Sequence, residues 1–145
     1  MNVGIIGSGG REHAICLSIK NSKKVNKIYC IPGNAGTSKI AENINIDLNN
    51  FNAVKDLVLS KKIELVIIGP EKPLVDGIVD FFQDLNVKVF GPNKLASQLE
   101  GSKIFTKKLC EKYKIPTAKF GIFNNSKDSK KFLEKSTFPI VIKAD

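Results

Sequence analysis

Short apolar runs alternate with segments of helical periodicity along most of the chain, and this pattern predicts an α/β fold. Each run has the length of a strand, and glycine or proline follows it directly. Between the runs, apolar residues recur at the spacing of one helix face. The predicted strands are Val3–Ile6, Lys27–Ile31, Glu64–Ile68 and Val87–Phe90, and the predicted helices are Arg11–Asn21, Ala53–Ser60 and Leu74–Leu85. Continuous apolar strands that alternate with helices indicate a doubly wound parallel sheet covered on both faces.

The character of the chain changes after Gly101. Ser102 is suited to cap a helix, and a lysine-rich helix is expected from there to about Lys112. The remaining pattern predicts a strand near Lys119–Phe123, a helix near Asp128–Lys135 and a strand at Ile140–Lys143. The expected organisation is a domain over residues 1–100, a connecting helix and linker over 101–117, and a β-α-β segment over 118–145. Because the last predicted strand is cut off just after a lysine, the chain is expected to be a fragment that stops within a domain.

A loop rich in glycine or proline follows each strand of the first domain. These loops are Gly7–Gly10, Pro32–Thr37, Gly69–Pro73 and Gly91–Pro92. In a doubly wound sheet, ligands bind beyond the carboxyl ends of the strands. Four such loops at one edge therefore predict a ligand-binding site. The third loop also carries Glu71, whose carboxylate is suited to hold a ribose hydroxyl or a substrate amine.

The first loop has the chemistry of an anion site. It leads directly into Arg11 and His13, the only arginine and the only histidine of the chain. A glycine-rich turn presents free N–H groups at the positive end of a helix, and a guanidinium binds phosphate in a bidentate manner. The sequence therefore predicts a phosphate site at Gly9, Gly10 and Arg11. For Glu12 and His13 two interpretations stay open: they contact the ligand, or they serve only the helix.

The same loop argues against a dinucleotide-binding fingerprint. Glu12 occupies the position of the third glycine in G-x-G-x-x-G, so the pattern fails. A dehydrogenase would also place Asp or Glu at the end of the second strand, where this chain has Ile31-Pro32-Gly33. Binding of nicotinamide or flavin cofactors is therefore not expected.

Composition excludes several further classes of protein. The net charge is +9, but the first 100 residues carry 12 basic and 10 acidic side chains, so the excess lies in the last third. Lysines without arginines or interleaved aromatics are typical of a solvated face, and no nucleic-acid binding is expected. No apolar stretch is long enough to span a membrane, and binding of the protein to a membrane is not expected. Three widely spaced cysteines fit reduced thiols in a cytoplasmic protein.

Taken in order, the motifs of this chain resemble those of the phosphoribosylamine–glycine ligases (glycinamide ribonucleotide synthetases) of purine biosynthesis. The resemblance runs from end to end of the chain and implies a biotin-carboxylase-like N-terminal α/β domain followed by an ATP-grasp module. The matching stretches are Gly7–Ala14, Pro32–Thr37, Gly69–Val75, Phe90–Pro92, Gln98–Lys103, Ile115–Ala118 and Val141–Asp145. Each motif is weak alone, but their order and spacing are highly specific.

The resemblance also implies a reaction and its ligands. ATP phosphorylates the carboxylate of glycine, and the amine of 5-phosphoribosylamine then attacks the acyl phosphate to give glycinamide ribonucleotide, ADP and phosphate. The full-length enzyme is expected to be a cytoplasmic monomer that uses ATP and Mg²⁺ or Mn²⁺. The implied substrate-binding residues are Gly9, Gly10 and Arg11 at the phosphate, Asn34, Thr37 and Glu71 around the ribose, and Glu12, His13, Ala35, Gly36 and Pro70 nearby. Lys103 and Lys143 are implied at the nucleotide, and no residue is assigned as a catalytic base.

Length is where the chain departs from the resemblance. The lid over the ATP phosphates and the metal ligands are expected beyond Asp145, so the 145-residue chain alone is not expected to catalyse the ligation. Two alternatives stay open: another ATP-grasp enzyme, of the biotin carboxylase or carboxyaminoimidazole ribonucleotide synthetase type, and a non-catalytic nucleotide-binding module. The segments Pro32–Thr37 and Gly69–Val75 favour the glycine ligase over the first of these.

Overall fold

A computed structural model describes all residues of the chain, Met1–Asp145, which form two compact units. The first unit comprises Met1–Ser97 and the second Gln98–Asp145. None of the helices combines the length and the apolar character that crossing a bilayer requires.

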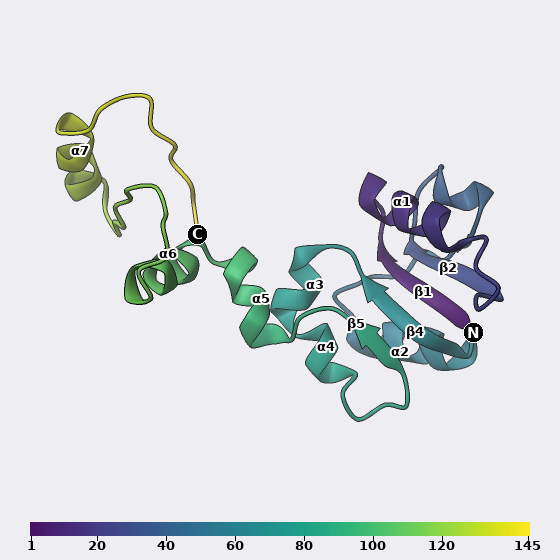
Figure 1. Ribbon diagram of the computed structural model, residues 1–145. Helices are drawn as coiled ribbons and strands as arrows, with labels where there is room; N and C mark the ends of the chain where they lie inside the picture. Colours follow the sequence, from purple (N-terminus) through teal and green to yellow (C-terminus); the bar gives the residue numbers. More distant parts are fainter. The chain divides into compact units, whose positions relative to one another are not determined.

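The first unit is built on a sheet of five parallel strands in the order β3-β2-β1-β4-β5 (Figure 1). The strands are β1 (Asn2–Gly7), β2 (Lys27–Pro32), β3 (Glu42–Asn43), β4 (Ile63–Ile68) and β5 (Lys88–Phe90). From β1 the chain builds outward to β3 on one side, then returns to place β4 and β5 on the other side of β1. The strand order therefore reverses between β1 and β4, which is the switch point at which sheets of this kind bind ligands.

Helices cover both faces of this sheet, and alternate strand residues point to each face. Helix α1 (Gly10–Ile19) packs on one face, where its Cys16 is buried with Val3 and Ile5 of β1. Helices α2 (Phe51–Ser60) and α4 (Ile78–Phe81) cover the other face, where Ile6 of β1 is buried. The expected doubly wound α/β architecture is confirmed, because each long parallel strand can bury both of its faces only between two helical layers.

The helix predicted over Leu74–Leu85 is wrong, because the structure breaks it at Gly77. Helix α3 (Glu71–Asp76) ends there and α4 begins at Ile78. Gly77 has φ +100°, and its N–H group donates to the carbonyl groups of the last turn of α3. This left-handed conformation suits glycine and terminates a helix. The apolar periodicity continues past the break, so periodicity alone joins the two helices.

A cluster of two lysines and one glutamate lies beside the start of β2. Lys27 and Lys61 both form ion pairs with the carboxylate of Glu42, at 2.6 and 2.9 Å, and both ammonium groups lie over the ring of Tyr29. Hydrogen bonding to Lys27, and then to Lys61, lowers the pKa of Glu42. Hydrogen bonding to Glu42 raises the pKa of Lys27. This lysine–glutamate cluster lies at the edge of the sheet that the short strand β3 forms.

Two free thiols lie between α1 and β2. Cys16 and Cys30 are fully buried, and their sulfur atoms are 3.0 Å apart. Burial, followed by hydrogen bonding to Cys16, raises the pKa of Cys30 to about 12. The Cys30 thiol is therefore protonated at neutral pH. Both buried cysteines pack as small apolar side chains.

The second unit contains helices but no strands. Helix α5 (Lys94–Gly101), which the sequence did not predict, runs into it from the first unit, and helices α6 (Lys103–Lys112) and α7 (Ser126–Glu134) confirm two expected helices. The Oγ of Ser102 accepts from the N–H of Phe105, which confirms it as the N-cap of α6. The strands expected near 119–123 and 140–143 do not form. Neither segment has a neighbouring strand to pair with, and an unpaired extended segment gains no ladder of hydrogen bonds.

Candidate functional site

Three of the loops at the carboxyl edge of the sheet begin side by side. The N–H of Gly33 donates to the carbonyl of Gly7 at 3.1 Å, and the N–H of Gly69 donates to the carbonyl of Ile6 at 3.0 Å. The parallel ladder thus continues beyond β1 into the loops that follow β2 and β4. We name these the first loop (Gly7–Gly10), the second loop (Pro32–Thr37) and the third loop (Gly69–Pro73). The register of the parallel sheet thus brings the starts of these three loops together, as expected.

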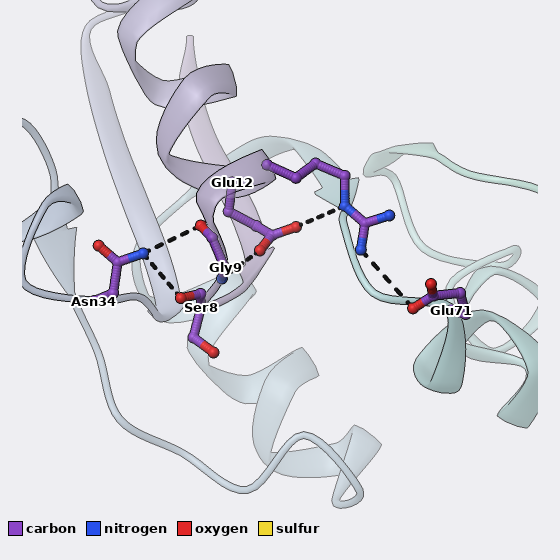
Figure 2. A network of polar contacts seen from close by, with 6 residues as sticks. Ser8, Gly9, Glu12, Asn34 and Glu71 are labelled. Atoms are coloured by element: carbon purple, nitrogen blue, oxygen red, sulfur yellow. Dashed lines mark hydrogen bonds and ion pairs between the residues drawn. The ribbon is translucent and has the colours of Figure 1, made fainter.

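The carboxylate of Glu12 lies beneath the first loop. The residue is only 3% exposed, although it is charged and sits in the first turn of α1. Its Oε2 accepts from the N–H of Gly9 at 2.5 Å, and its Oε1 accepts from Nε of Arg11 at 3.1 Å. Figure 2 shows this carboxylate turned toward the loop. A buried carboxylate needs such charge-assisted partners, and here the chain itself supplies them.

The side chain of Asn34 joins the second loop to the first. Its Nδ2 donates to the carbonyl oxygens of Ser8 and Gly9, at 2.8 and 3.1 Å (Figure 2). Its Oδ1 accepts from the N–H groups of Gly36 and Thr37, at 2.8 and 3.0 Å. All the hydrogen-bonding groups of this amide are therefore engaged within the protein. Asn34 acts as a bridge between the loops.

Asn43 of β3 supports the same bridge, and the sequence analysis missed it. Its Nδ2 donates to the carbonyl of Asn34 at 2.7 Å, and its Oδ1 lies 2.8 Å from the hydroxyl of Thr37. Thr37 is fully buried and begins a single 3-10 turn, Thr37–Lys39. The alternation of polar and apolar residues from Asn43 to Ile46 was the available signal that Asn43 lies in an extended segment.

Three backbone N–H groups at the start of α1 keep no partner in the chain. They belong to Gly10, Arg11 and Glu12, the first three residues of the helix, which have no preceding carbonyl to bond. The guanidinium of Arg11 is half-exposed beside them, with Nη2 3.8 Å from Oε2 of the half-exposed Glu71. The arrangement presents backbone donors, a helix N-terminus and a guanidinium on one surface, which together bind an anion.

The other expected site residues surround this surface or support it. His13 is half-buried with its ring against Gly36, Ala35 is exposed, and Pro70 precedes α3 as its N-cap residue. The side chains of Glu12 and Thr37 are buried and hydrogen-bonded within the protein, and their expected contact with a substrate stays a prediction. Gly9, Gly10, Arg11, Ala35 and Glu71 are the candidates left on the surface.

The two lysines expected at a nucleotide, Lys103 and Lys143, both lie in the second unit and both are exposed. The side chain of Asp145 accepts from the hydroxyl of Ser102 at 2.8 Å and from the N–H of Ile104 at 3.0 Å. These bonds, with that to Ile104 first, lower the pKa of Asp145. The segment that ends the chain is thereby tied to the residues on both sides of Lys103, through the Ser102 hydroxyl and the Ile104 N–H.

Comparison with known proteins adds the decisive observation. Residues 1–100 match the family model described as phosphoribosylglycinamide synthetase, N domain, and residues 101–145 match that of the ATP-grasp (A) domain. The chain belongs to the phosphoribosylglycinamide synthetase family. The resemblance seen in the sequence is confirmed. A phosphoribosylamine–glycine ligase of Caldanaerobacter subterraneus subsp. tengcongensis is 48% identical over 145 residues, which are all of this chain and 35% of that protein. The chain thus spans about a third of the length of the curated relatives it matches.

Solved structures agree with the fold. The phosphoribosylamine–glycine ligase of Thermotoga maritima matches with a TM-score of 0.67 and 29% identity over 94% of this chain and 31% of its own. The N5-carboxyaminoimidazole ribonucleotide synthetase of Thermus thermophilus gives a higher TM-score, 0.71, at 15% identity over 94% of this chain and 37% of its own. A biotin carboxylase domain gives 0.65 at 19% identity, covering 99% of this chain and 35% of its own. The last two share the fold alone with the phosphoribosylglycinamide synthetase family, since different enzymes build on this scaffold.

Proposed function

We propose that the full-length protein carrying this chain is an ATP-dependent ligase that joins glycine to 5-phosphoribosylamine through glycyl phosphate. The products are glycinamide ribonucleotide, ADP and phosphate. Support comes from membership of the phosphoribosylglycinamide synthetase family and from relatives named phosphoribosylamine–glycine ligase, which match the whole of this chain. In this proposal the first unit holds the sugar phosphate, and the second contributes to nucleotide binding.

The observation that carries the proposal is the open start of α1 at the switch point. We place the phosphate of the substrate on the N–H groups of Gly10, Arg11 and Glu12, with the guanidinium of Arg11 beside them. Glu71 then lies next to the ribose, because its carboxylate approaches the same guanidinium from the third loop. Gly9 contributes backbone surface, since its own N–H group is occupied by Glu12. His13, Ala35, Gly36 and Pro70 form the rim, and Asn34 and Thr37 act by holding the second loop in place.

These contacts hold the substrate but move no proton. An amine acts as a nucleophile in its uncharged form, and an amine on a sugar carbon needs no dedicated base when it attacks an acyl phosphate. What the first unit supplies is orientation: phosphate and ribose contacts fix the position of the amine relative to the carboxylate to be activated. For this reason no catalytic residue is assigned among residues 1–145.

We place Lys103 and Lys143 at the phosphates of ATP, where ammonium groups offset the negative charge that moves during phosphoryl transfer. Mg²⁺ is the expected metal of the full-length protein, with Mn²⁺ as its substitute. Among residues 1–145 no three His, Cys, Asp or Glu side chains gather as a metal centre, so no step is assigned to a metal held here. Its ligands are expected in the part of the protein that follows, as is the lid over the phosphates. The proposed protein is a cytoplasmic monomer without nucleic-acid or membrane partners.

Two assays test the proposal. Full-length protein supplied with ATP, glycine and phosphoribosylamine should release ADP only when all three are present, whereas residues 1–145 alone should release none. Ribose 5-phosphate should bind the full-length protein, and Arg11→Ala should weaken that binding by about 10- to 100-fold, the loss typical of a charge-assisted pair. Turnover with bicarbonate and aminoimidazole ribonucleotide instead of glycine and phosphoribosylamine would favour the carboxyaminoimidazole ribonucleotide synthetase type and contradict the proposal.

A further inference from the structure

We infer that Glu12 is a positioning residue of the sugar-phosphate site: its buried carboxylate fixes the Gly9 peptide and the Arg11 guanidinium in the orientation that an anion requires. The identity of the ligand rests on the proposed function. The role of Glu12 rests on the geometry of the first loop. The side chain of Glu12 touches no ligand in this scheme and acts through its two hydrogen-bond partners, Gly9 and Arg11.

The hydrogen bonds of the first loop fix which N–H groups remain open. In the peptide that joins Ser8 to Gly9, the carbonyl is bonded by Asn34 and the N–H by Glu12. In the next peptide, the Gly9 carbonyl accepts from Asn34 and from the N–H of His13. Because the C=O and N–H of a trans peptide point in opposite directions, this anchoring turns the N–H of Gly10 away from the protein. The peptide before Gly9 is held at both ends only while Glu12 is in place.

The guanidinium of Arg11 is held through one of its three nitrogen atoms. Glu12 engages Nε at 3.1 Å, and Nη2 lies 3.8 Å from Glu71. A guanidinium held at Nε keeps its two terminal nitrogens on the outward side, which is the fork that binds phosphate oxygens. Glu12 is 3% exposed whereas Arg11 is half-exposed, so the carboxylate supports the cation from inside the protein.

The switch point is shaped around this carboxylate. A Cβ atom on Gly69 would lie 2.0 Å from Oε1 of Glu12, and one on Gly7 would lie 2.7 Å from its Cδ. The ends of β1 and β4 are therefore both free of side chains where Glu12 lies. By contrast, a Cβ on Gly10 would meet nothing within 4 Å. Gly7 at the end of β1 and Gly69 just after β4 leave room for Glu12, and Gly10 faces the space left for a ligand.

A glutamate in the first turn of a helix can also serve only to offset the helix dipole. That role needs no burial and is met by exposed carboxylates. Burial of Glu12 between two glycine strand ends, with one oxygen bonded to the Gly9 N–H and the other to the Arg11 guanidinium, exceeds what the dipole requires. The two roles differ in what they predict, since only the positioning role makes substrate affinity depend on Glu12.

The test is Glu12→Gln in the full-length protein, with steady-state kinetics for each substrate. The amide keeps the size of the side chain but is uncharged. Its nitrogen is a donor, so the two ends of the amide cannot both accept from the Gly9 and Arg11 N–H groups. We expect the KM for phosphoribosylamine to rise about 10-fold or more, while kcat and the KM values for glycine and ATP change less than about two-fold. The matched control is Glu42→Gln, which removes a paired carboxylate on β3, outside the site, and should leave all three KM values unchanged.

A second measurement begins with the unaltered protein, so its first result does not depend on the variant folding, and then compares phosphate binding with that of Glu12→Gln. With selective ¹⁵N labelling of glycine and arginine, the Gly9 amide and the Arg11 Nε–H should resonate far downfield, as donors to a carboxylate do. Inorganic phosphate should shift the Gly10 and Arg11 amides, and Glu12→Gln should weaken that effect about 10-fold. If neither downfield signal is seen, or if phosphate shifts the same amides equally in both proteins, Glu12 does not position the site.

The kinetic outcomes separate this inference from the proposed function. Two outcomes overturn the positioning role and leave the ligase assignment intact. In the first, the KM for phosphoribosylamine is unchanged in Glu12→Gln. In the second, thermal stability falls and the kinetic parameters worsen equally for all three substrates. Absence of any turnover by the unaltered full-length protein overturns the ligase assignment. In that case the phosphate titration alone decides the role of Glu12.

Discussion

Adding a methyl group at Gly69 should destabilise the first unit strongly, and Glu12 should be the cause. Gly69 follows β4 directly, and an added Cβ would lie 2.0 Å from Oε1 and 2.6 Å from Cδ of the buried Glu12 carboxylate. The backbone of Gly69 is not in the left-handed region, whereas Gly7, the other glycine beside this carboxylate, has φ +125°. Gly69→Ala therefore tests space alone, without a change in backbone strain.

The size of the destabilisation depends on whether the Glu12 carboxylate moves to make room for the added methyl group. Overpacking of a closed site costs about 1–3 kcal/mol when the neighbours cannot relax. If the carboxylate shifts instead, it gives up the bond to Gly9 or to Arg11, and a hydrogen bond to a charged group contributes about 1.5–3 kcal/mol. Because the two costs are alternatives, we expect Gly69→Ala to lower the free energy of unfolding by about 1.5–3 kcal/mol.

A double-mutant cycle assigns that cost to Glu12. Unfolding in urea, followed by far-UV circular dichroism, would be measured for Gly69→Ala, Glu12→Ala and the double variant. With the carboxylate removed, the added methyl group has room, so Gly69→Ala should cost less than about 1 kcal/mol in the Glu12→Ala background. The reasoning is refuted if Gly69→Ala costs the same in both backgrounds, or if alone it costs less than about 1 kcal/mol.

Three further outcomes are expected. Gly10→Ala should leave thermal stability equal or slightly higher, because its Cβ meets open space, but should weaken binding of ribose 5-phosphate in calorimetric titration; retained affinity would contradict a ligand close to this backbone. The lowered pKa of Glu42 means that its stabilising contribution is present above the ordinary pKa of 4.5 and is lost as the pH falls through the folded value. Glu42→Gln should therefore flatten the acid limb of the stability curve on the acid side of pH 4.5, and parallel curves for the two proteins would count against this cluster. At about pH 8, the upper end of the range in which proteins tend to be most stable, iodoacetamide should modify the half-buried Cys110 first. It should reach the buried Cys16 and Cys30 only after unfolding, since both are fully buried and the pKa of Cys30 is about 12; equal rates for all three thiols would show that the pair is accessible in the folded protein.

Most of the sheet was predictable because its long strands are apolar runs closed by glycine or proline. Strand β3 escaped prediction because it has two residues, Glu42 and Asn43, both polar and only half-buried. Such a strand is defined by its neighbour β2 and not by its own composition. The two strands expected after residue 117 failed for the converse reason: their composition suits a strand, but no partner strand lies beside them in this chain.

The candidate site was predictable as far as it is local in sequence. The glycine turn, the start of the helix and Arg11 lie within a few residues of one another, and the chemistry of the turn follows from their types. The burial of Glu12 was not predictable in this way, because it depends on Gly69, which lies far along the chain in the third loop. The structural role of Asn34 was hidden likewise, since its partners Ser8 and Gly9 come from another loop.

The sharing of Arg11 between two carboxylates bears on how a ligand arrives. With Glu12 and Glu71 both close to the only guanidinium of the chain, the mouth of the site offers an approaching anion little net positive potential. Long-range attraction speeds association and fades with added salt, so encounter at such a mouth should proceed at an ordinary diffusive rate that ionic strength hardly alters. Free phosphate and other small anions gain little from charge alone there. Under the proposed function, selectivity then depends on the contacts that a molecule bearing both a sugar and a phosphate makes after it arrives.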